Sequence, residues 1–199
     1  MSLVSFESTL NNYFSSMQSN QISESDFANE IGNELSDFYS NISGTTTDSG
    51  VYSSLPASGV GTIQSFTFAT SVFVASFLTE LTNMKLESNA GDDSIFINGY
   101  CNALALALAS SSGTISSTGT YVSGTSTLPY TASGTFIISG SSIISTCQTL
   151  LTTTCSNMRS STSGGNSNLA SAMASLTGSY TITATYTSGL IGSGSGVGS

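Results

Sequence analysis

The tripeptides NMK at 83–85 and NMR at 157–159 repeat one short pattern, and a degenerate copy, SMQ, lies at 16–18. Lys85 and Arg159, the only two basic residues of the chain, occupy the same place in this pattern. Self-similarity at a regular period is the sequence signature of an internally repeated protein, and the three copies predict units of roughly 70 residues. Units of that size share their cores with neighbouring units or subunits.

Methionine, glycine and tyrosine recur at similar offsets in each unit. A second apolar segment follows each methionine and ends in a small residue and a glycine, and a tyrosine lies 8 positions after that glycine. We predict that the glycines end helices and that the tyrosines pack within strands. The marks are Met17, Met84 and Met158; Gly44, Gly113 and Gly178; and Tyr52, Tyr121 and Tyr186.

Hydrophobic periodicity predicts two amphipathic helices at the start of each unit. Apolar residues recur at steps of three and four from Leu3 to Met17 and from Phe27 to Ile42, as one face of a helix requires. Ser23, three positions before an acidic residue, has the spacing of a helix-capping pair. The helices are expected at 2–18 with 27–42, at 66–86 with 96–110, and at 143–158 with a shorter partner at 169–176.

A segment rich in Ser, Thr, Gly and Tyr follows each helix pair. At 114–122 and 180–186, β-branched or aromatic residues alternate with small ones, which favours strands. Leu-Pro pairs at 55–56 and 128–129 predict a bend or a sheet edge, because proline cannot donate a ladder hydrogen bond. Alternating glycines at 192–198 predict either a flexible tail or a close approach of backbones against a neighbouring subunit. The predicted fold class is α+β, with three repeats of helix, helix and strand or hairpin at 1–65, 66–138 and 139–199, stacked in a row or closed around an axis.

The chain carries few charges, and they are unevenly distributed. Only 7% of its residues are charged, against about 25% in average soluble domains. All 11 acidic residues lie at or before Asp93, so residues 1–93 carry a net charge of −10 and residues 94–199 carry +1. We expect either a hydroxyl-rich surface or a surface that partner subunits largely cover. Two basic residues cannot neutralise a phosphate track, which argues against nucleic acid as a partner.

Groups that carry out catalysis are scarce in this sequence. It contains no histidine, the commonest general base and metal ligand. A serine activated by Lys85 is formally open, but arginine at the equivalent position 159 cannot act as a base, so both basic residues are predicted to meet helix carboxyl ends. The acidic residues at 24–37 fit a solvated helix face better than a glycosidase pair. Asp92 and Asp93 fit a helix cap better than calcium ligands. We expect no enzymatic activity, no cofactor and no metal site.

The cysteines and the apolar segments indicate no further special chemistry. Cys101, Cys147 and Cys155 have no CxxC spacing and are expected as buried free thiols. No secretory signal is evident at 1–7, which lacks a basic start and a continuous apolar run. The uncharged stretch 94–110, interrupted by asparagines, is interpreted as a buried helix rather than a membrane span.

The strand segments rich in Ser, Thr and Gly, the amphipathic helices at 27–42 and 96–108, and the glycine-alternating end at 192–198 resemble accessory virion proteins of tailed bacteriophages. The resemblance implies a non-enzymatic structural subunit of the capsid, neck or tail, assembled in the host cytoplasm and located in the virion. Its partners would be copies of itself and other virion proteins, with neither nucleic acid nor membrane among them.

Two other functions remain open from the sequence. A carbohydrate-binding surface or fibre-tip module would use Tyr52, Tyr121 and Tyr186 as stacking platforms, although we favour a packing role for these side chains. A self-assembling filament or surface-layer subunit would rely on the same protein–protein contacts as a virion component.

Overall fold

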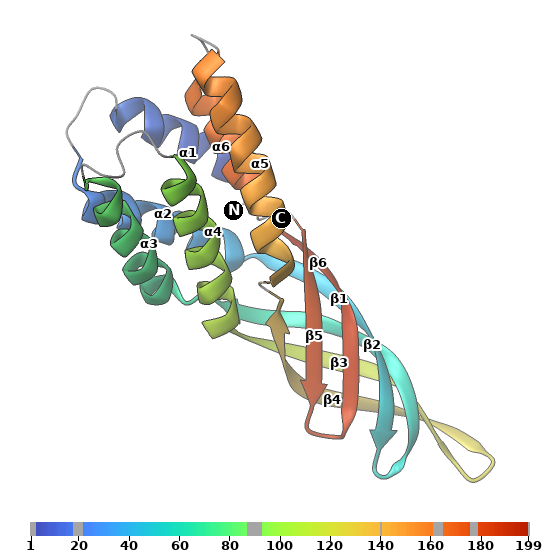
Figure 1. Cartoon of the computed structure of the whole chain (residues 1–199). Helices are drawn as coiled ribbons and strands as arrows, with labels where there is room; N and C mark the ends of the chain where they lie inside the picture. The colour runs from blue at the N-terminus through green and yellow to red at the C-terminus, as the bar shows by residue number, and fades with distance from the viewer. Residues whose placement is uncertain are drawn as a thin grey trace.

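The computed structural model describes residues 3–17, 22–86, 93–139, 141–160, 165–175 and 179–198. The fold is α+β, as predicted, and two helices followed by two strands occur three times along the described chain (Figure 1). The elements are α1 (Leu3–Met17), α2 (Glu24–Tyr39), β1 (Ile42–Tyr52), β2 (Leu55–Thr67), α3 (Thr70–Met84), α4 (Asp93–Ser110), β3 (Ser112–Ser123), β4 (Ser126–Ile138), α5 (Ser141–Ser160), α6 (Gly165–Ser175), β5 (Ser179–Tyr186) and β6 (Leu190–Gly198).

The strands form a closed antiparallel barrel in which each strand pairs with its neighbours in the sequence. The barrel closes because β6 pairs with β1 from Ile42 opposite Gly198 to Gly50 opposite Leu190. The three hairpins therefore lie around one axis and do not stack in a row. The helices gather at one end of the barrel, and the hairpin tips extend from the other end (Figure 1).

The two Leu-Pro pairs lie where a strand has a neighbour on one side only, which confirms the predicted edge positions. Pro56 pairs with Val51 of β1, and the pairing of β2 with β3 begins one residue later. Pro129 pairs with Thr120 of β3, and the pairing of β4 with β5 begins only at Gly134. Proline is tolerated at such positions because no ladder hydrogen bond is lost.

Helix α2 begins at the predicted cap and ends before the predicted glycine. The Ser23 hydroxyl oxygen accepts from Asp26 N at 3.1 Å, and the same hydroxyl donates to Asp26 Oδ2 at 2.7 Å. The prediction that Gly44 and Gly113 end helices is wrong, because both lie inside the first strand of a hairpin. A Cβ at Gly44 would stand 2.7 Å from Gly196 Cα, so this glycine allows β1 and β6 to approach. Gly178 lies outside the described residues.

The helix predicted at 66–86 begins instead at Thr70. Phe66 belongs to β2, where a register shift between Ile63 and Ser65 turns it into the core. Phe66 and Phe68 are buried two positions apart, as in a strand. In the sequence, both residues also fit the helical pattern of the residues that follow, so the sequence does not reveal the strand. The other predicted helices are confirmed within a few residues, including the shorter final one. Within the described ranges, no helix is long and apolar enough to cross a membrane.

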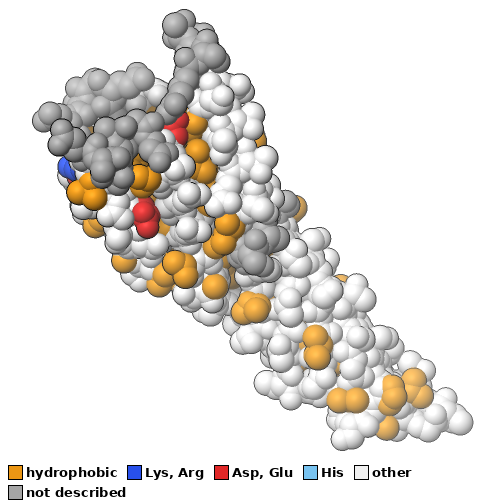
Figure 2. Space-filling model, viewed as in Figure 1, with side chains coloured by type: hydrophobic (Ala, Val, Ile, Leu, Met, Phe, Trp, Pro, Cys, Tyr) orange, Lys and Arg blue, Asp and Glu red, His pale blue; other side chains and the backbone are white. Residues whose placement is uncertain are grey.

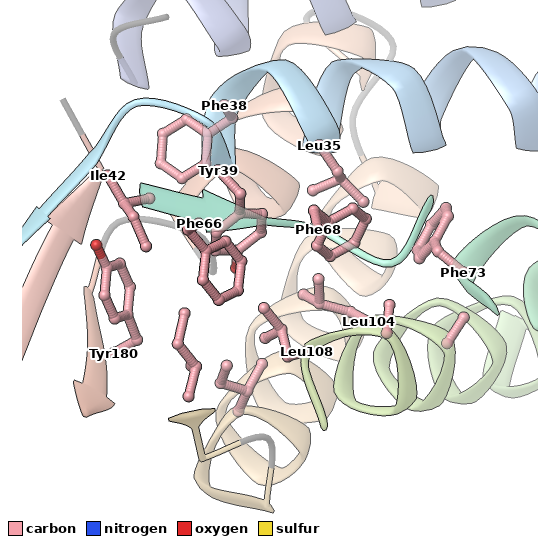
Figure 3. Packing of buried hydrophobic residues seen from close by; sticks show 14 of the residues in the cluster. Leu35, Phe38, Tyr39, Ile42, Phe66, Phe68, Phe73, Leu104, Leu108 and Tyr180 are labelled. Atoms are coloured by element: carbon pink, nitrogen blue, oxygen red, sulfur yellow. The ribbon is translucent and has the colours of Figure 1, made fainter. Parts of the chain in front are cut away.

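The main core lies where the helices meet the open end of the barrel (Figure 3). The ring of Tyr39 stacks on Phe68 with centroids 5.1 Å apart, and Phe66 stacks on Phe136 at 5.5 Å. Leu104 and Leu108 of α4 are fully buried in the same cluster. Aromatic side chains from α2 and β2 thus join the helical layer to the barrel, because each of them buries a large apolar area in one place.

The prediction of free thiols is wrong for two of the three cysteines. Cys101 of α4 and Cys147 of α5 form a disulfide, with their Cα atoms 5.7 Å apart. The two helices lie side by side, a placement that a separation of 46 residues in the sequence does not reveal. Cys155, two turns further along α5, is half-buried and lies outside this bond.

Candidate functional site

The interior of the barrel is lined by small residues and tyrosines at alternate positions. Glycines of β6 face inward, and a Cβ at Gly196 would stand 2.5 Å from Tyr180 Cζ. A Cβ at Gly194 would stand 2.7 Å from Thr46 Cα on the neighbouring strand. The alternating glycines at 192–198 therefore belong to a strand and not to a flexible tail, and the backbones that they approach are those of the same barrel rather than of a neighbouring subunit.

A single carboxylate lies inside this barrel. Asp48 is the only acidic or basic residue on the described strands, and its side chain is fully buried. The Thr46 hydroxyl donates to Asp48 Oδ1 at 2.6 Å, and the Tyr186 hydroxyl lies 3.3 Å from the Thr46 hydroxyl oxygen. Asp48 Oδ2 is buried without a hydrogen-bond partner. Burial without a donor is costly for a charged oxygen, so this atom needs an explanation.

Hydroxyl groups extend this cluster across the barrel. Burial raises the pKa of Tyr186 to about 12; hydrogen bonds to Thr46 and Ser117 lower it, and a hydrogen bond to Asp48 together with the charge of that carboxylate raises it. The Ser117 hydroxyl oxygen lies 3.1 Å from the Tyr130 hydroxyl. Side chains of β1, β5, β3 and β4 thus form one polar network within an otherwise apolar or glycine-lined interior.

Sequence reasoning did not single out Asp48 or Thr46. The available signal is that Asp48 is the only charged residue between Asp37 and Glu80, and that it lies in a run of Ser, Thr and Gly that fits a strand. A lone acid in an uncharged strand indicates a special environment.

The three repeated tyrosines all point into the barrel. The rings of Tyr52 and Tyr121 lie 5.2 Å apart near the hairpin tips, and Tyr52 also stacks on Tyr130 at 4.8 Å. Tyr186 is 3% exposed and belongs to the polar network. Their rings contact one another or the barrel wall, an arrangement that favours packing over sugar stacking.

The repeated methionines and the two basic residues lie on the helices or at a helix end. Lys85 is the carboxyl-terminal cap of α3, and its Nζ pairs with Glu24 Oε1 at 2.6 Å, which joins α3 to the start of α2. The hydrogen bond from Lys85 holds the pKa of Glu24 below its usual range. Arg159 lies in α5 and Met17 lies in α1, but the side chains of these two residues are outside the described part of the structure. Met84 and Met158 are half-buried.

An apolar groove lies beside the ion pair. It has a volume of about 340 Å³ and runs between α2, α3 and α4, with Phe27, Leu81 and Phe96 among its lining residues. The groove carries one acidic and one basic side chain, Glu24 and Lys85, which neutralise each other. This arrangement offers apolar contact area rather than a reactive group.

The outer face of the barrel is uncharged. Hydroxyl side chains alternate with aliphatic ones, and Val60 and Ile191 are 51% and 62% exposed. In the view of Figure 2, the charged side chains lie over the helices, and the barrel shows only apolar and uncharged polar atoms. The exposed aliphatic residues of the strands are Val51, Val60, Val122, Leu128, Ile137, Ile191 and Val197.

Two surfaces and one interior cluster are thus the candidates for function: the uncharged outer face of the barrel, the apolar groove, and the polar network around Asp48. Comparisons with protein-family models, with curated proteins and with solved structures found no match to this chain.

Proposed function

We propose that this protein is a non-enzymatic structural subunit of a viral particle, a capsid, neck or tail accessory component of a tailed bacteriophage located in the virion and assembled in the host cytoplasm. It acts by packing against copies of itself and other virion proteins. The observation that carries the proposal is the uncharged outer face of the barrel with its exposed aliphatic side chains. A surface without charge has little electrostatic protection against association.

The distribution of acidic residues supports contact through the barrel. Apart from the buried Asp48, every acidic residue in the described part of the chain lies on a helix. Copies with a net charge of −9 repel one another most where these helices approach. Barrel-to-barrel contact keeps the acidic helices apart, and salt screens the remaining repulsion.

We further propose that the segments 1–65, 66–138 and 139–199 are copies of one unit. The order of two helices and a hairpin in each segment supports this proposal. Tyr52, Tyr121 and Tyr186 support it as well, because each ends or nearly ends the first strand of its hairpin and faces the interior. Three similar units around one axis give a single chain three similar outward faces, and symmetric assemblies are built from repeated contacts.

A carbohydrate-binding module remains the main alternative. Its hydroxyl-rich outer strands would make the contacts, since the repeated tyrosines face inward. A filament or surface-layer subunit would use the same contacts as a virion component and would differ in the shape of its assemblies.

The test is the mass of the purified chain in solution, measured by light scattering after size exclusion, with negative-stain microscopy of the same peak. We expect uniform assemblies much larger than one chain of 20.3 kDa. Ile191→Asp introduces a charge on the outer face of the barrel and is expected to reduce the mass. Leu106→Asp, at a site 53% exposed on α4, is the matched control and is expected to leave the mass unchanged.

A compact monomer of the wild-type chain would contradict packing as the function, and glycan binding would then be tested. Equal effects of the two substitutions would contradict the barrel as the contact surface. Open-ended filaments in the microscope would favour the filament alternative over a closed particle.

A further inference from the structure

We propose that the interior of the barrel binds one hard monovalent cation, with Asp48, Thr46 and Tyr186 as the centre of its ligand set. This inference concerns the buried cluster and does not depend on the proposed assembly function.

The charge of Asp48 has no partner on the strands that surround it. Asp48 is fully buried, and no basic residue lies on the described strands. Lys85 is engaged with Glu24 at the helical end. A carboxylate in a protein interior normally has a charged partner or is neutralised in some other way, because desolvation of an unpaired charge is costly. The carboxylate of Asp48 therefore requires a neutralising group that does not come from the barrel itself.

The two carboxylate oxygens of Asp48 differ in their contacts. Asp48 Oδ1 accepts a hydrogen bond from Thr46, whereas Oδ2 has no partner. A proton on Oδ2 would also remove the charge, but it would leave the stability of the fold independent of the cation in the salt. A water molecule would satisfy Oδ2 but would leave the charge. A bound cation removes the charge and contacts the oxygen at once.

Several oxygen atoms converge above Gly61. Gly61 of β2 has no side chain, and the space above it is occupied by the Tyr186 hydroxyl, the Thr46 hydroxyl and Asp48 Oδ2. The last of these atoms lies 3.0 Å from the position that a Cβ of Gly61 would take, and the other two lie closer. The hydroxyls of Ser117 and Tyr130, which continue the network, supply further oxygen atoms.

The chemistry of this ligand set indicates the type of ion. Carboxylate and hydroxyl oxygens are hard ligands, which suit hard cations rather than soft transition metals. The cluster contains a single carboxylate, so one positive charge balances it and a divalent ion would leave an excess charge in the interior. Na⁺ is the probe that fits this charge balance, with K⁺ as a second monovalent ion.

The experiment is thermal unfolding of the full chain, followed by circular dichroism in NaCl, KCl or choline chloride at equal ionic strength. A ligand that binds only the folded state raises the melting midpoint as its concentration increases. We expect the midpoint to rise with Na⁺ or K⁺ beyond its value in choline chloride. Asp48→Asn is expected to abolish this dependence, and Asp37→Asn on α2, which also removes one charge, is expected to preserve it.

If Asp48→Asn fails to fold, Thr46→Val tests the same site, because it removes one ligand oxygen and retains the side-chain volume. It is expected to shift the cation dependence to higher concentrations. Equal melting of the wild-type chain in all three salts would overturn the proposal. So would a cation dependence that survives in a folded Asp48→Asn or Thr46→Val variant unchanged. Stabilisation by CaCl₂ alone would overturn the assignment of a monovalent ion.

Discussion

Gly196 of β6 lies directly against the ring of Tyr180 on β5, its partner in the strand register. A Cβ at position 196 would stand 2.5 Å from Tyr180 Cζ, which is shorter than any stable carbon–carbon contact. The tyrosine ring covers the exposed backbone of the glycine and fills the space that its missing side chain leaves. Pairs of this kind allow a barrel of six strands to contain large aromatic side chains.

Replacement of this glycine should therefore destabilise the barrel. We expect Gly196→Ala to lower the free energy of unfolding by about 1–3 kcal/mol, the usual cost of an overpacked interior. Urea denaturation followed by circular dichroism measures the change. Ser195→Ala, on the exposed outer face of the same strand, should alter the free energy of unfolding by less than about 0.5 kcal/mol. Equal losses for the two variants would contradict the packing argument.

Two buried tyrosines should respond differently to removal of their hydroxyl groups. The Tyr100 hydroxyl is fully buried without a hydrogen-bond partner, so Tyr100→Phe should leave the free energy of unfolding unchanged or raise it by about 1 kcal/mol. The Tyr180 hydroxyl donates to the Val197 carbonyl oxygen at 3.1 Å, and Tyr180→Phe should lose about 1 kcal/mol. Chemical denaturation of both variants under one set of conditions decides between these outcomes. A loss at Tyr100 as large as that at Tyr180 would indicate that its hydroxyl has a partner.

The disulfide between Cys101 and Cys147 should stabilise the helical layer. Reduction, or the double substitution to alanine, should lower the free energy of unfolding by about 2–4 kcal/mol, because the bond restricts the unfolded chain. Intact mass under oxidising and reducing conditions verifies the bond, and denaturation with and without reductant measures its effect. Cys155→Ala is the control and should respond to reductant as the wild-type chain does. Insensitivity of the wild-type chain to reductant would contradict the prediction.

The ion pair of Glu24 and Lys85 should make the stability of the fold depend on pH in a known direction. Lys85 lowers the pKa of Glu24 in the folded state, so the pair stabilises the fold above the pKa of Glu24 in the unfolded chain. This stabilisation is lost as the pH falls through the folded value. Lys85→Met should return the pKa of Glu24 to its usual range in a carboxyl NMR titration. The difference in free energy of unfolding between the wild-type chain and Lys85→Met should be present at neutral pH and absent in acid. A difference of the same size at both pH values would exclude the ion pair as its cause.

Local patterns in the sequence determined the elements of the fold. Apolar residues at steps of three and four placed the helices of residues 3–17 and 93–110 within a few positions, because helix periodicity depends only on near neighbours. The Ser23 cap and the strands rich in Thr and Tyr could be predicted for the same reason. The sequence alone also determined the uneven distribution of charge along the chain.

Only the tertiary structure decided how these elements meet. Ile42 and Gly198 pair across almost the whole chain to close the barrel, and no local pattern encodes such a contact. The disulfide depends on two helices that become neighbours only in the folded protein, so Cys101 gave no sign of its partner. Asp48 stands out in the sequence only as a lone acid on a polar strand, and closure of the barrel decides that it is buried among hydroxyl groups. Each of these features depends on pairing between distant segments, whereas hydrophobic periodicity reports only which face of its own segment a residue occupies.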